Sequence, residues 1–150
     1  MKFLADVNVI FPLLISRHQH RDKALEWFDS TAEGDVVLCR LTRLGALRLL
    51  CNAQVMGADV LQPKSAMEAL RVLEADERIV LLHEPDGLDE TLKKFAAPCK
   101  TTPNLWTDAY LASFAAVAGL RLVSFDRGFS KFRGLDFLRL EPGDSEATSG

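Results

Sequence analysis

The chain has 150 residues, of which 48% are hydrophobic and 26% charged, and this length and composition predict one globular domain with a full core. The net charge of -3 argues against a general nucleic-acid-binding surface, so a nucleic-acid partner would have to meet local basic patches. The three cysteines form no Cys-x-x-Cys pair, which argues against a zinc site and a disulfide framework. We therefore expect a cytoplasmic protein, and the apolar segment at 9–15 is too short to cross a membrane.

Strands and helices are expected to alternate along the chain. A short apolar strand at 3–5 ends in Asp6, and Asn8 is expected to cap the helix that follows at once. Further strands are expected at 36–39, 79–82, 121–125 and 136–140. Helices are expected at 22–32, from a Thr42 cap to about 50, and at 63–76, 86–97 and 105–118, with a loop from Gly57 to Pro63. This order predicts one α/β domain over 1–142 with a mainly parallel sheet of four to five strands, and a disordered tail at 143–150.

Three carboxylates are candidates for one functional site. Asp6 and Asp126 each follow an apolar strand, and ligands in open α/β sheets bind outside the carboxyl ends of the strands. Asp108 is the only charged residue of the apolar helix at 105–118, and Asn104 lies four residues before it on the same face. A cluster of carboxylates suits Mg²⁺ or Mn²⁺. The alternative is that Asp6 and Asp126 are solvated strand ends and Asp108 pairs locally, and spacing alone does not choose.

Basic residues lie near these acids in the sequence. An acidic centre with a basic rim suits a phosphodiester substrate, and Arg48 and Arg127 are the candidates for contacting it. Ordinary surface charge remains the alternative for each basic residue taken singly. The basic residues of the predicted rim are Arg17, Arg21, Arg40, Arg43, Arg48, Arg127, Lys131 and Arg133.

Four segments together resemble the motifs of PIN-domain ribonucleases, and most closely those of the VapC-like toxins of bacterial toxin–antitoxin pairs. They are Asp6-Val-Asn8-Val, Leu41-Thr-Arg-Leu-Gly-Ala-Leu-Arg48, Thr107-Asp-Ala-Tyr-Leu-Ala112 and Ser124-Phe-Asp126-Arg-Gly-Phe129. Each motif alone is weak, but the ordered set is fairly specific and spans about residues 1–140. The resemblance implies a three-layer α/β/α PIN-like fold and a nuclease domain.

The same resemblance implies an activity and its partners. The protein would be a Mg²⁺- or Mn²⁺-dependent endoribonuclease, usually a homodimer, and a cognate antitoxin would insert a segment into its acidic groove. Matched by position, Asp6, Asp108 and Asp126 would be the catalytic, metal-binding carboxylates. Asn8 would support the first of them and Thr107 would orient the site.

Gly45 departs from the family pattern, which usually has a glutamate three residues before the arginine matched by Arg48. Glycine offers no ligand and costs a helix about 1 kcal/mol relative to alanine. A second hypothesis is therefore a degenerate PIN-like module that binds RNA or a protein without cleaving it. A third is a phosphotransferase of the haloacid-dehalogenase type, suggested by Asp6-Val-Asn8, but the second acid and the Asp-Asp pair of that class are missing.

We expect no functional role for the tryptophans and for two of the histidines. Trp27 and Trp106 are expected to pack in the core rather than stack on bases. His18 and His20 are expected to be solvated turn residues.

Overall fold

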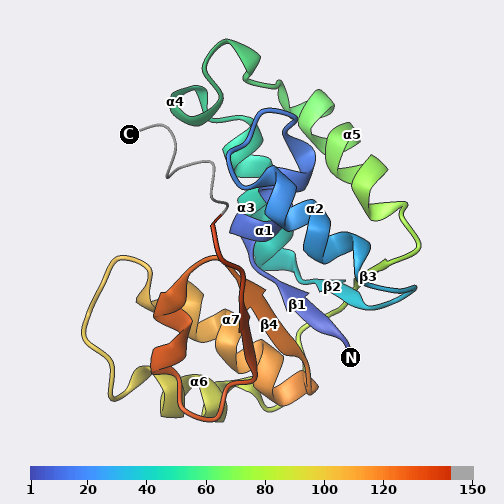
Figure 1. Cartoon of the computed structure of the whole chain (residues 1–150). Coiled ribbons are helices and arrows are strands. Elements are labelled where there is room, and N and C mark those ends of the chain that lie inside the picture. The colour runs from blue at the N-terminus through green and yellow to red at the C-terminus, as the bar shows by residue number, and fades with distance from the viewer. Residues whose placement is uncertain (143–150) are drawn as a thin grey trace.

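The computed structural model describes residues 1–142 and contains a five-stranded parallel sheet between layers of helices (Figure 1). The strands are β1 (Phe3–Ala5), β2 (Val36–Leu38), β3 (Ile79–Leu81), β4 (Arg121–Ser124) and β5 (Phe137–Arg139). The α-helices are α1 (Val7–Leu14), α2 (Arg21–Asp29), α3 (Arg40–Leu50), α4 (Ala53–Met56), α5 (Pro63–Glu74), α6 (Leu88–Ala96) and α7 (Leu105–Ala118). Two short 3₁₀ helices are η1 (Gly57–Asp59) and η2 (Arg127–Lys131). The predicted α/β fold with a parallel sheet is confirmed, and the predicted tail at 143–150 lies outside the described residues.

The strand order β3-β2-β1-β4-β5 places β1 at the centre of the sheet. β1 pairs in parallel with β2 on one side and with β4 on the other, with Ala5 opposite Val123. Because parallel strands end at the same edge, the residues that follow β1 and β4 are neighbours in space although 120 positions separate Asp6 from Asp126 in the sequence. The sheet topology therefore brings two of the predicted carboxylates to one edge.

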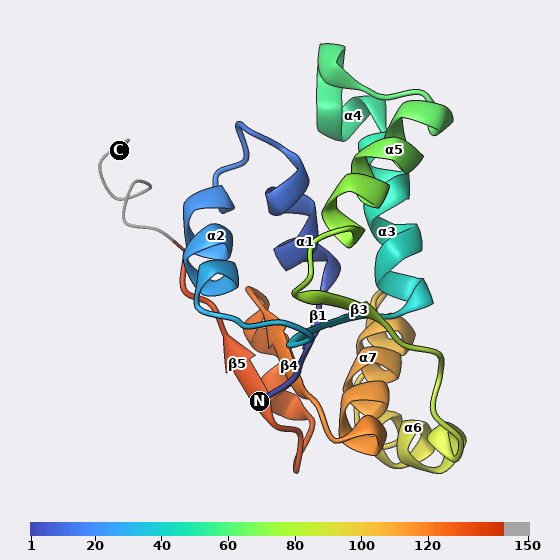
Figure 2. The same cartoon turned by 90° about the vertical axis from the view of Figure 1, so that its right-hand side faces the viewer.

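The three inner strands β2, β1 and β4 are mostly buried, as expected for a parallel sheet covered by helices, whereas the edge strands β3 and β5 are partly exposed. Leu4 and Leu122 pack with residues of α6 and α7, while Ala5 and Val123 pack with residues of α1 and α2. Figure 2 shows α1 and α2 on one side of the sheet and α6 and α7 on the other. This arrangement is the three-layer α/β/α architecture.

Two predicted helix caps were wrong. The N-cap of α1 is Asp6, whose Oδ1 accepts a hydrogen bond from the Val7 N–H at 2.7 Å, so Asn8 lies inside the helix. The N-cap of α3 is Cys39 rather than Thr42, whose hydroxyl donates back to the Cys39 carbonyl at 2.9 Å. In both cases a single residue separates the strand from the helix, and that residue is the N-cap.

The segment predicted as a loop between Gly57 and Pro63 is partly helical. α4 and η1 occupy 53–59, and the side chain of Asn52 caps α4 through the Gln54 N–H at 2.9 Å. Helices of three or four residues are too short to give a hydrophobic period, so the sequence shows no sign of them. The Pro63 start of α5 and the Gly119 end of α7 agree with expectation.

Gly45 lies where α3 crosses the start of α1. A Cβ built on Gly45 would come within 2.6 Å of Val7 Cγ2, closer than real Cβ atoms approach other atoms. Valine is stiff at χ1, so its methyl group does not move aside easily. Glycine at this position therefore allows the close approach of two helices, which is a structural reason for the residue.

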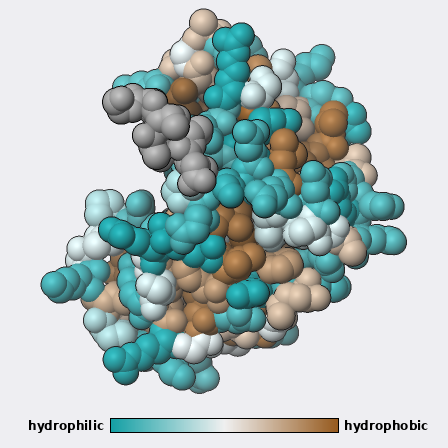
Figure 3. Space-filling view, viewed as in Figure 1, coloured by the Kyte–Doolittle hydropathy of each residue, from teal (hydrophilic) through white to brown (hydrophobic). Residues whose placement is uncertain are grey.

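The surface is mostly polar, and on the face in Figure 3 polar side chains surround separate apolar patches. Trp106 is 65% exposed, so the prediction that it packs in the core was wrong, whereas Trp27 is buried. Position 106 follows the first residue of α7, and its side chain points away from the sheet that Ala109 and Ala112 cover. No helix within residues 1–142 has the length and apolar character needed to span a bilayer.

Candidate active site

Asp6 is a largely buried carboxylate at the carboxyl end of the central strand. Its Oδ1 accepts the hydrogen bond from Val7 that starts α1, and its Oδ2 accepts one from the Ser124 hydroxyl at 2.8 Å. Burial raises the pKa of Asp6 and the charge of Asp126 adds to the rise, while the hydrogen bonds from Ser124 and Val7 oppose it. The helix cap and the strand β4 thus fix this carboxylate in place from two sides.

Ser124 connects the elements of the site, and the sequence alone assigned it no role. Its fully buried hydroxyl lies 3.2 Å from Asn8 Oδ1 and accepts a hydrogen bond from the Asp126 N–H at 3.0 Å. Asn8 Oδ1 also accepts from the Phe125 N–H at 3.2 Å. Asn8 therefore supports Asp6 indirectly by holding the end of β4. A serine inside the apolar run Leu122-Val-Ser-Phe125 is the signal that could have found it.

Asp108 and Asp126 complete the carboxylate group. Asp108 lies in the first turn of α7, where burial, and then the charges of Asp6 and Asp126, raise its pKa to about 6, against a lowering by Lys131. Asp126 caps η2, and its Oδ1 accepts a hydrogen bond from the Gly128 N–H at 2.8 Å. The charge of Asp126 thus raises the pKa of both Asp6 and Asp108, which places the three acids close together.

These acids line a cleft of about 720 Å³, which we call the acidic cleft. Seven of the eight predicted site residues line it: Asp6, Asn8, Arg48, Asn104, Thr107, Asp108 and Asp126. Arg127 does not line it, although it follows Asp126 directly. The hydroxyl of Thr107 donates to the Asn104 carbonyl at 3.0 Å, which ties the start of α7 together at the mouth of the cleft.

The donor chemistry of the acidic cleft fits a hard divalent cation. The pKa values of Asp6 and Asp108 are raised, and none of the ion pairs found within the described chain involves Asp6, Asp108 or Asp126. No three His, Cys, Asp or Glu side chains of residues 1–142 stand together as a ready ligand set. Mg²⁺ does not need such a set, because it keeps several waters and binds through one or two carboxylates. A cation here would offset the mutual repulsion of the acids.

Some residues of the predicted basic rim serve the fold, and others line clefts. Arg21 donates to the carbonyls of Pro12 and Leu13 at 3.1 and 2.9 Å, and Arg43 pairs with Glu74 at 2.7 Å, so both serve the fold. Arg48 lines the acidic cleft, while Lys131 and Arg133 line a neighbouring one.

His18 and His20 are more ordered than solvated turn residues. The His20 ring stacks on Phe125 with centroids 4.5 Å apart, and the His18 ring meets Phe11 edge-on at 5.5 Å. Both line the acidic cleft, so the prediction of free solvation was wrong. Packing against apolar rings from other segments is not visible in the local sequence.

The family model of the PIN domain matches residues 3–135. The chain belongs to the PIN-domain family. The match covers all four motifs from Asp6 to Phe129 and leaves the haloacid-dehalogenase alternative without support.

Named relatives of this PIN domain include Ribonuclease VapC41 of Mycobacterium tuberculosis, which is 39% identical over 142 residues, covering 91% of this chain and 97% of the relative. Among solved structures, the sarcin-ricin loop cleaving toxin VapC20 of the same organism superposes with a TM-score of 0.67 at 15% identity, covering 94% of this chain and all of that one. A toxin–antitoxin complex from Klebsiella pneumoniae gives a TM-score of 0.61 at 15% identity, with 91% and 96% covered. At these identities the two structures establish the shared fold.

Proposed function

We propose that this protein is a metal-dependent endoribonuclease toxin that hydrolyses RNA phosphodiester bonds and is neutralised by a cognate antitoxin. The observation that carries the proposal is the meeting of Asp6, Asp108 and Asp126 in one cleft of a PIN domain whose relative at 39% identity is a ribonuclease. Arg48 adds a cation at the same cleft that suits a phosphate group.

Each residue of the acidic cleft has a role in this chemistry. Asp6, Asp108 and Asp126 would hold Mg²⁺ or Mn²⁺, which supplies Lewis acidity toward the phosphate and toward water. Asn8 and Ser124 position Asp6, and Thr107 and Asn104 hold the start of α7 that carries Asp108. Hydrolysis adds the oxygen of water to phosphorus and breaks its bond to the 3′ oxygen, leaving a 5′-phosphate and a 3′-hydroxyl.

An apolar hollow beside the acidic cleft supports an antitoxin partner. Leu44 and Trp106 are 53% and 65% exposed and line a hollow of about 350 Å³ together with Tyr110. Leu41, Leu44 and Thr107 border both the hollow and the acidic cleft. A peptide segment inserted into the acidic cleft would therefore lay apolar side chains on this surface.

We also propose a homodimer. Met67 and Val72 of α5 expose 63% and 60% of their surface on either side of the exposed Glu68–Arg71 ion pair, which offers a second copy a mixed apolar and charged surface. Light scattering of the purified protein would test it, and a monomer mass at all accessible concentrations would contradict it.

The Asp6→Asn substitution tests the catalytic assignment. Asparagine keeps an oxygen that can accept the Val7 hydrogen bond and caps helices as well as aspartate, so the fold should survive. We expect RNA cleavage with Mg²⁺ or Mn²⁺ to fall at least a hundredfold, while the circular dichroism spectrum and melting temperature stay close to wild type. Asp89→Asn, an exposed acid in the first turn of α6, is the matched control and should keep full activity.

The binding-module alternative rests on Gly45 and makes a different prediction. A module without nuclease activity has no need of a metal, so calorimetry would detect no Mn²⁺ binding at millimolar concentration. A nuclease should bind Mn²⁺ in wild type and lose that binding in Asp6→Asn. Full RNase activity in a contaminant-free Asp6→Asn preparation would overturn the proposed site.

A further inference from the structure

A second cleft, about 680 Å³ in volume, lies beside the acidic one and is lined by four cations: Lys94, Lys100, Lys131 and Arg133. We call it the basic cleft. No acidic residue lines it in the described chain, and none of its four cations takes part in an ion pair found there. Its charge is therefore not neutralised from within the protein.

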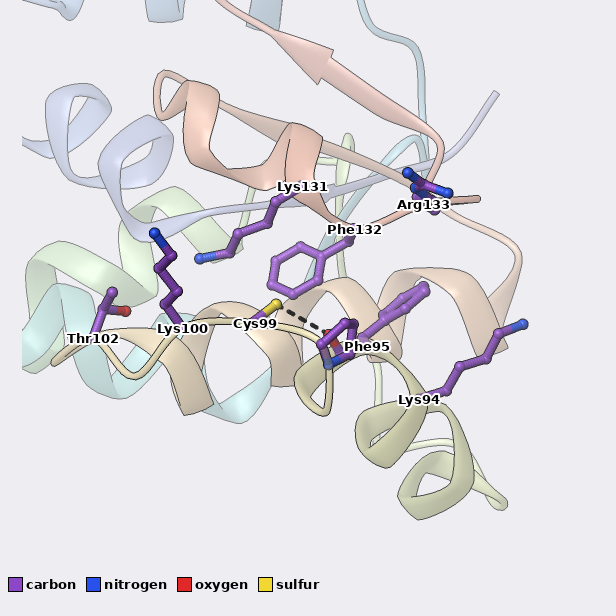
Figure 4. Close-up of a pocket in the computed structure, with 9 residues that line it drawn as sticks. Lys94, Phe95, Cys99, Lys100, Thr102, Lys131, Phe132 and Arg133 are labelled. Carbon is purple, nitrogen blue, oxygen red and sulfur yellow. Dashed lines mark hydrogen bonds between the residues drawn. The ribbon is translucent and has the colours of Figure 1, made fainter.

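The cations are arranged around an apolar floor (Figure 4). Phe95 and Phe132 are buried, with 7% and 3% exposed, so they support the floor and present little ring surface for base stacking. In Figure 4 the ends of Lys100 and Lys131 extend to the same side, near Thr102, while Lys94 and Arg133 extend to the other. Charges at both ends of one cleft suit a ligand that carries several separated negative groups.

Two chain segments run from the acidic cleft directly into the basic cleft. η2 follows its N-cap Asp126, which lines the acidic cleft, and ends at Lys131, which lines the basic one. Thr102 lines the basic cleft and Asn104, two residues later, lines the acidic one. Lys131 is also close enough to act electrostatically on Asp108. The two clefts are therefore adjacent parts of one surface.

The length of η2 sets the spacing between the clefts. Five residues of 3₁₀ helix span about 10 Å at about 2 Å each. A stacked nucleic-acid strand covers that distance in about three nucleotides at about 3.4 Å per phosphate. A strand that places one phosphate at the acidic cleft would thus present its neighbours to the basic cleft.

We propose that the basic cleft is a subsite that binds the phosphates of single-stranded RNA on one side of the scissile bond. This inference rests on the proposed function, because it takes RNA as the ligand. A repeating polyanion suits the separated, unneutralised cations better than an acidic protein segment does, because every nucleotide carries a negative phosphate at a regular spacing. The net charge of -3 makes such a local patch the means by which this protein holds RNA.

A matched pair of double variants tests the proposal. Lys94→Ala with Lys100→Ala removes two cations of the basic cleft. Lys93→Ala with Lys64→Ala removes two exposed cations outside it, and Lys93 is the helical neighbour of Lys94. Both pairs are made in the Asp6→Asn protein without metal, so that RNA is bound and not cut. The probe is a labelled single-stranded oligouridylate, and its anisotropy gives the dissociation constant over a range of salt concentrations.

We expect the cleft pair to weaken binding on the order of tenfold and to reduce the slope of log affinity against log salt by about 1.4, which is two phosphate contacts at about 0.7 each. The control pair should keep the slope of the parent. A dinucleotide, which is too short to reach from one cleft to the other, should show a smaller difference in affinity between the two pairs. Equal affinities and slopes for the two pairs, or no binding by the parent, would overturn the subsite.

The outcomes separate the subsite from the nuclease. If wild type fails to cleave RNA but binding depends on Lys94 and Lys100, the subsite stands and the proposed catalytic function fails. If wild type cleaves RNA and the two pairs bind alike, the function stands and the subsite fails. If the cleft pair loses affinity for polyglutamate and keeps its affinity for RNA, the cleft serves an acidic protein segment and the RNA proposal is wrong.

Discussion

Ser124 and Ser113 are both fully buried serines, yet their surroundings differ. The Ser124 hydroxyl donates to Asp6 and accepts from the Asp126 N–H, whereas Ser113 Oγ has no hydrogen-bond partner within the described chain. A buried polar group without a partner loses its hydration and gains nothing in return. The two positions therefore allow a direct comparison of a hydrogen-bonded hydroxyl in the site with a hydroxyl that has no partner in the described chain.

The Ser124→Ala substitution should destabilise the protein by about 1–3 kcal/mol, because it leaves a buried amide and a buried carboxylate without their partner. Cleavage should fall as well, since Asp6 loses the contact that positions it. Ser113→Ala should be neutral or slightly stabilising. Urea denaturation of both variants checks this, and an equal loss of stability in the two would show that Ser124 has no special role.

The raised pKa of Asp108 predicts a pH dependence for the metal-free protein. The pKa of Asp108 is about 6 in the folded protein and near 3.8 in the unfolded chain. The folded state therefore binds this proton more tightly. Protonation of Asp108 therefore stabilises the folded state below pH 4, and this stabilisation is lost as the pH rises through 6. Urea denaturation in the presence of EDTA at several pH values should show a stronger trend in wild type than in Asp108→Asn, where only the raised pKa of Asp6 remains. Parallel pH profiles of the two proteins would contradict it.

The individual residues of the site could be predicted to different degrees. Asp6, Asp108 and Asp126 were visible because a carboxylate beside or inside an apolar element contrasts with its neighbours. Asn8 was identified as a supporting residue only through the family resemblance, because its partners Ser124 and Phe125 lie more than a hundred positions away in the sequence. Ser124 and His20 act through tertiary contacts, which no local pattern encodes.

At the level of elements, the crossing of α1 and α3 explains the departure at Gly45. The sequence showed only a missing ligand and a helix-weakening glycine. The structure shows that the position faces Val7 with no room for a Cβ. A glutamate at this position would require α1 and α3 to separate or Val7 to be smaller. The absence of a fourth carboxylate at position 45 is therefore linked to the close packing of the two helices.

Substitutions at this crossing should be coupled. Gly45→Ala should destabilise the protein by about 1–3 kcal/mol through overpacking, although alanine is the better helix former. In a Val7→Ala background the same change should become neutral or stabilising by up to about 1 kcal/mol. A double-mutant cycle of unfolding free energies measures the coupling. Additive effects would mean that the two helices adjust freely.

The element boundaries show what sequence patterns can and cannot define. The long helices α5 and α7 were predicted to within two residues, because α5 has a clear apolar period, α7 is a long apolar run, and Pro63 and Gly119 mark the start of one and the end of the other. The caps of α1 and α3 were misplaced because a strand and a helix share one junction residue there. The exposed Trp106 was misassigned because α7 is apolar on nearly every face, so hydrophobicity alone does not indicate which side is buried.

At the level of the whole molecule, repulsion among the acids couples metal binding to stability. A ligand that binds only the folded state stabilises it by about 2.7 kcal/mol at a hundred times its dissociation constant. Mn²⁺ should therefore raise the melting temperature of wild type in a concentration-dependent way. Asp126→Asn should reduce this shift, whereas Asp89→Asn should preserve it. A melting temperature that does not change with Mn²⁺ up to millimolar concentration would favour a binding module.

The place of β1 at the centre of the sheet has a consequence for synthesis of the chain. β1 leaves the ribosome first, but its Asp6 is held by Ser124 of β4 and meets Asp126 beyond it. The acidic cleft therefore cannot assemble until translation has passed residue 126 and that stretch has emerged. A nascent chain that has not yet exposed residue 126 carries Asp6 and Asp108 and lacks the third acid, so this nuclease cannot act on RNA near its own site of synthesis until β4 and Asp126 have emerged.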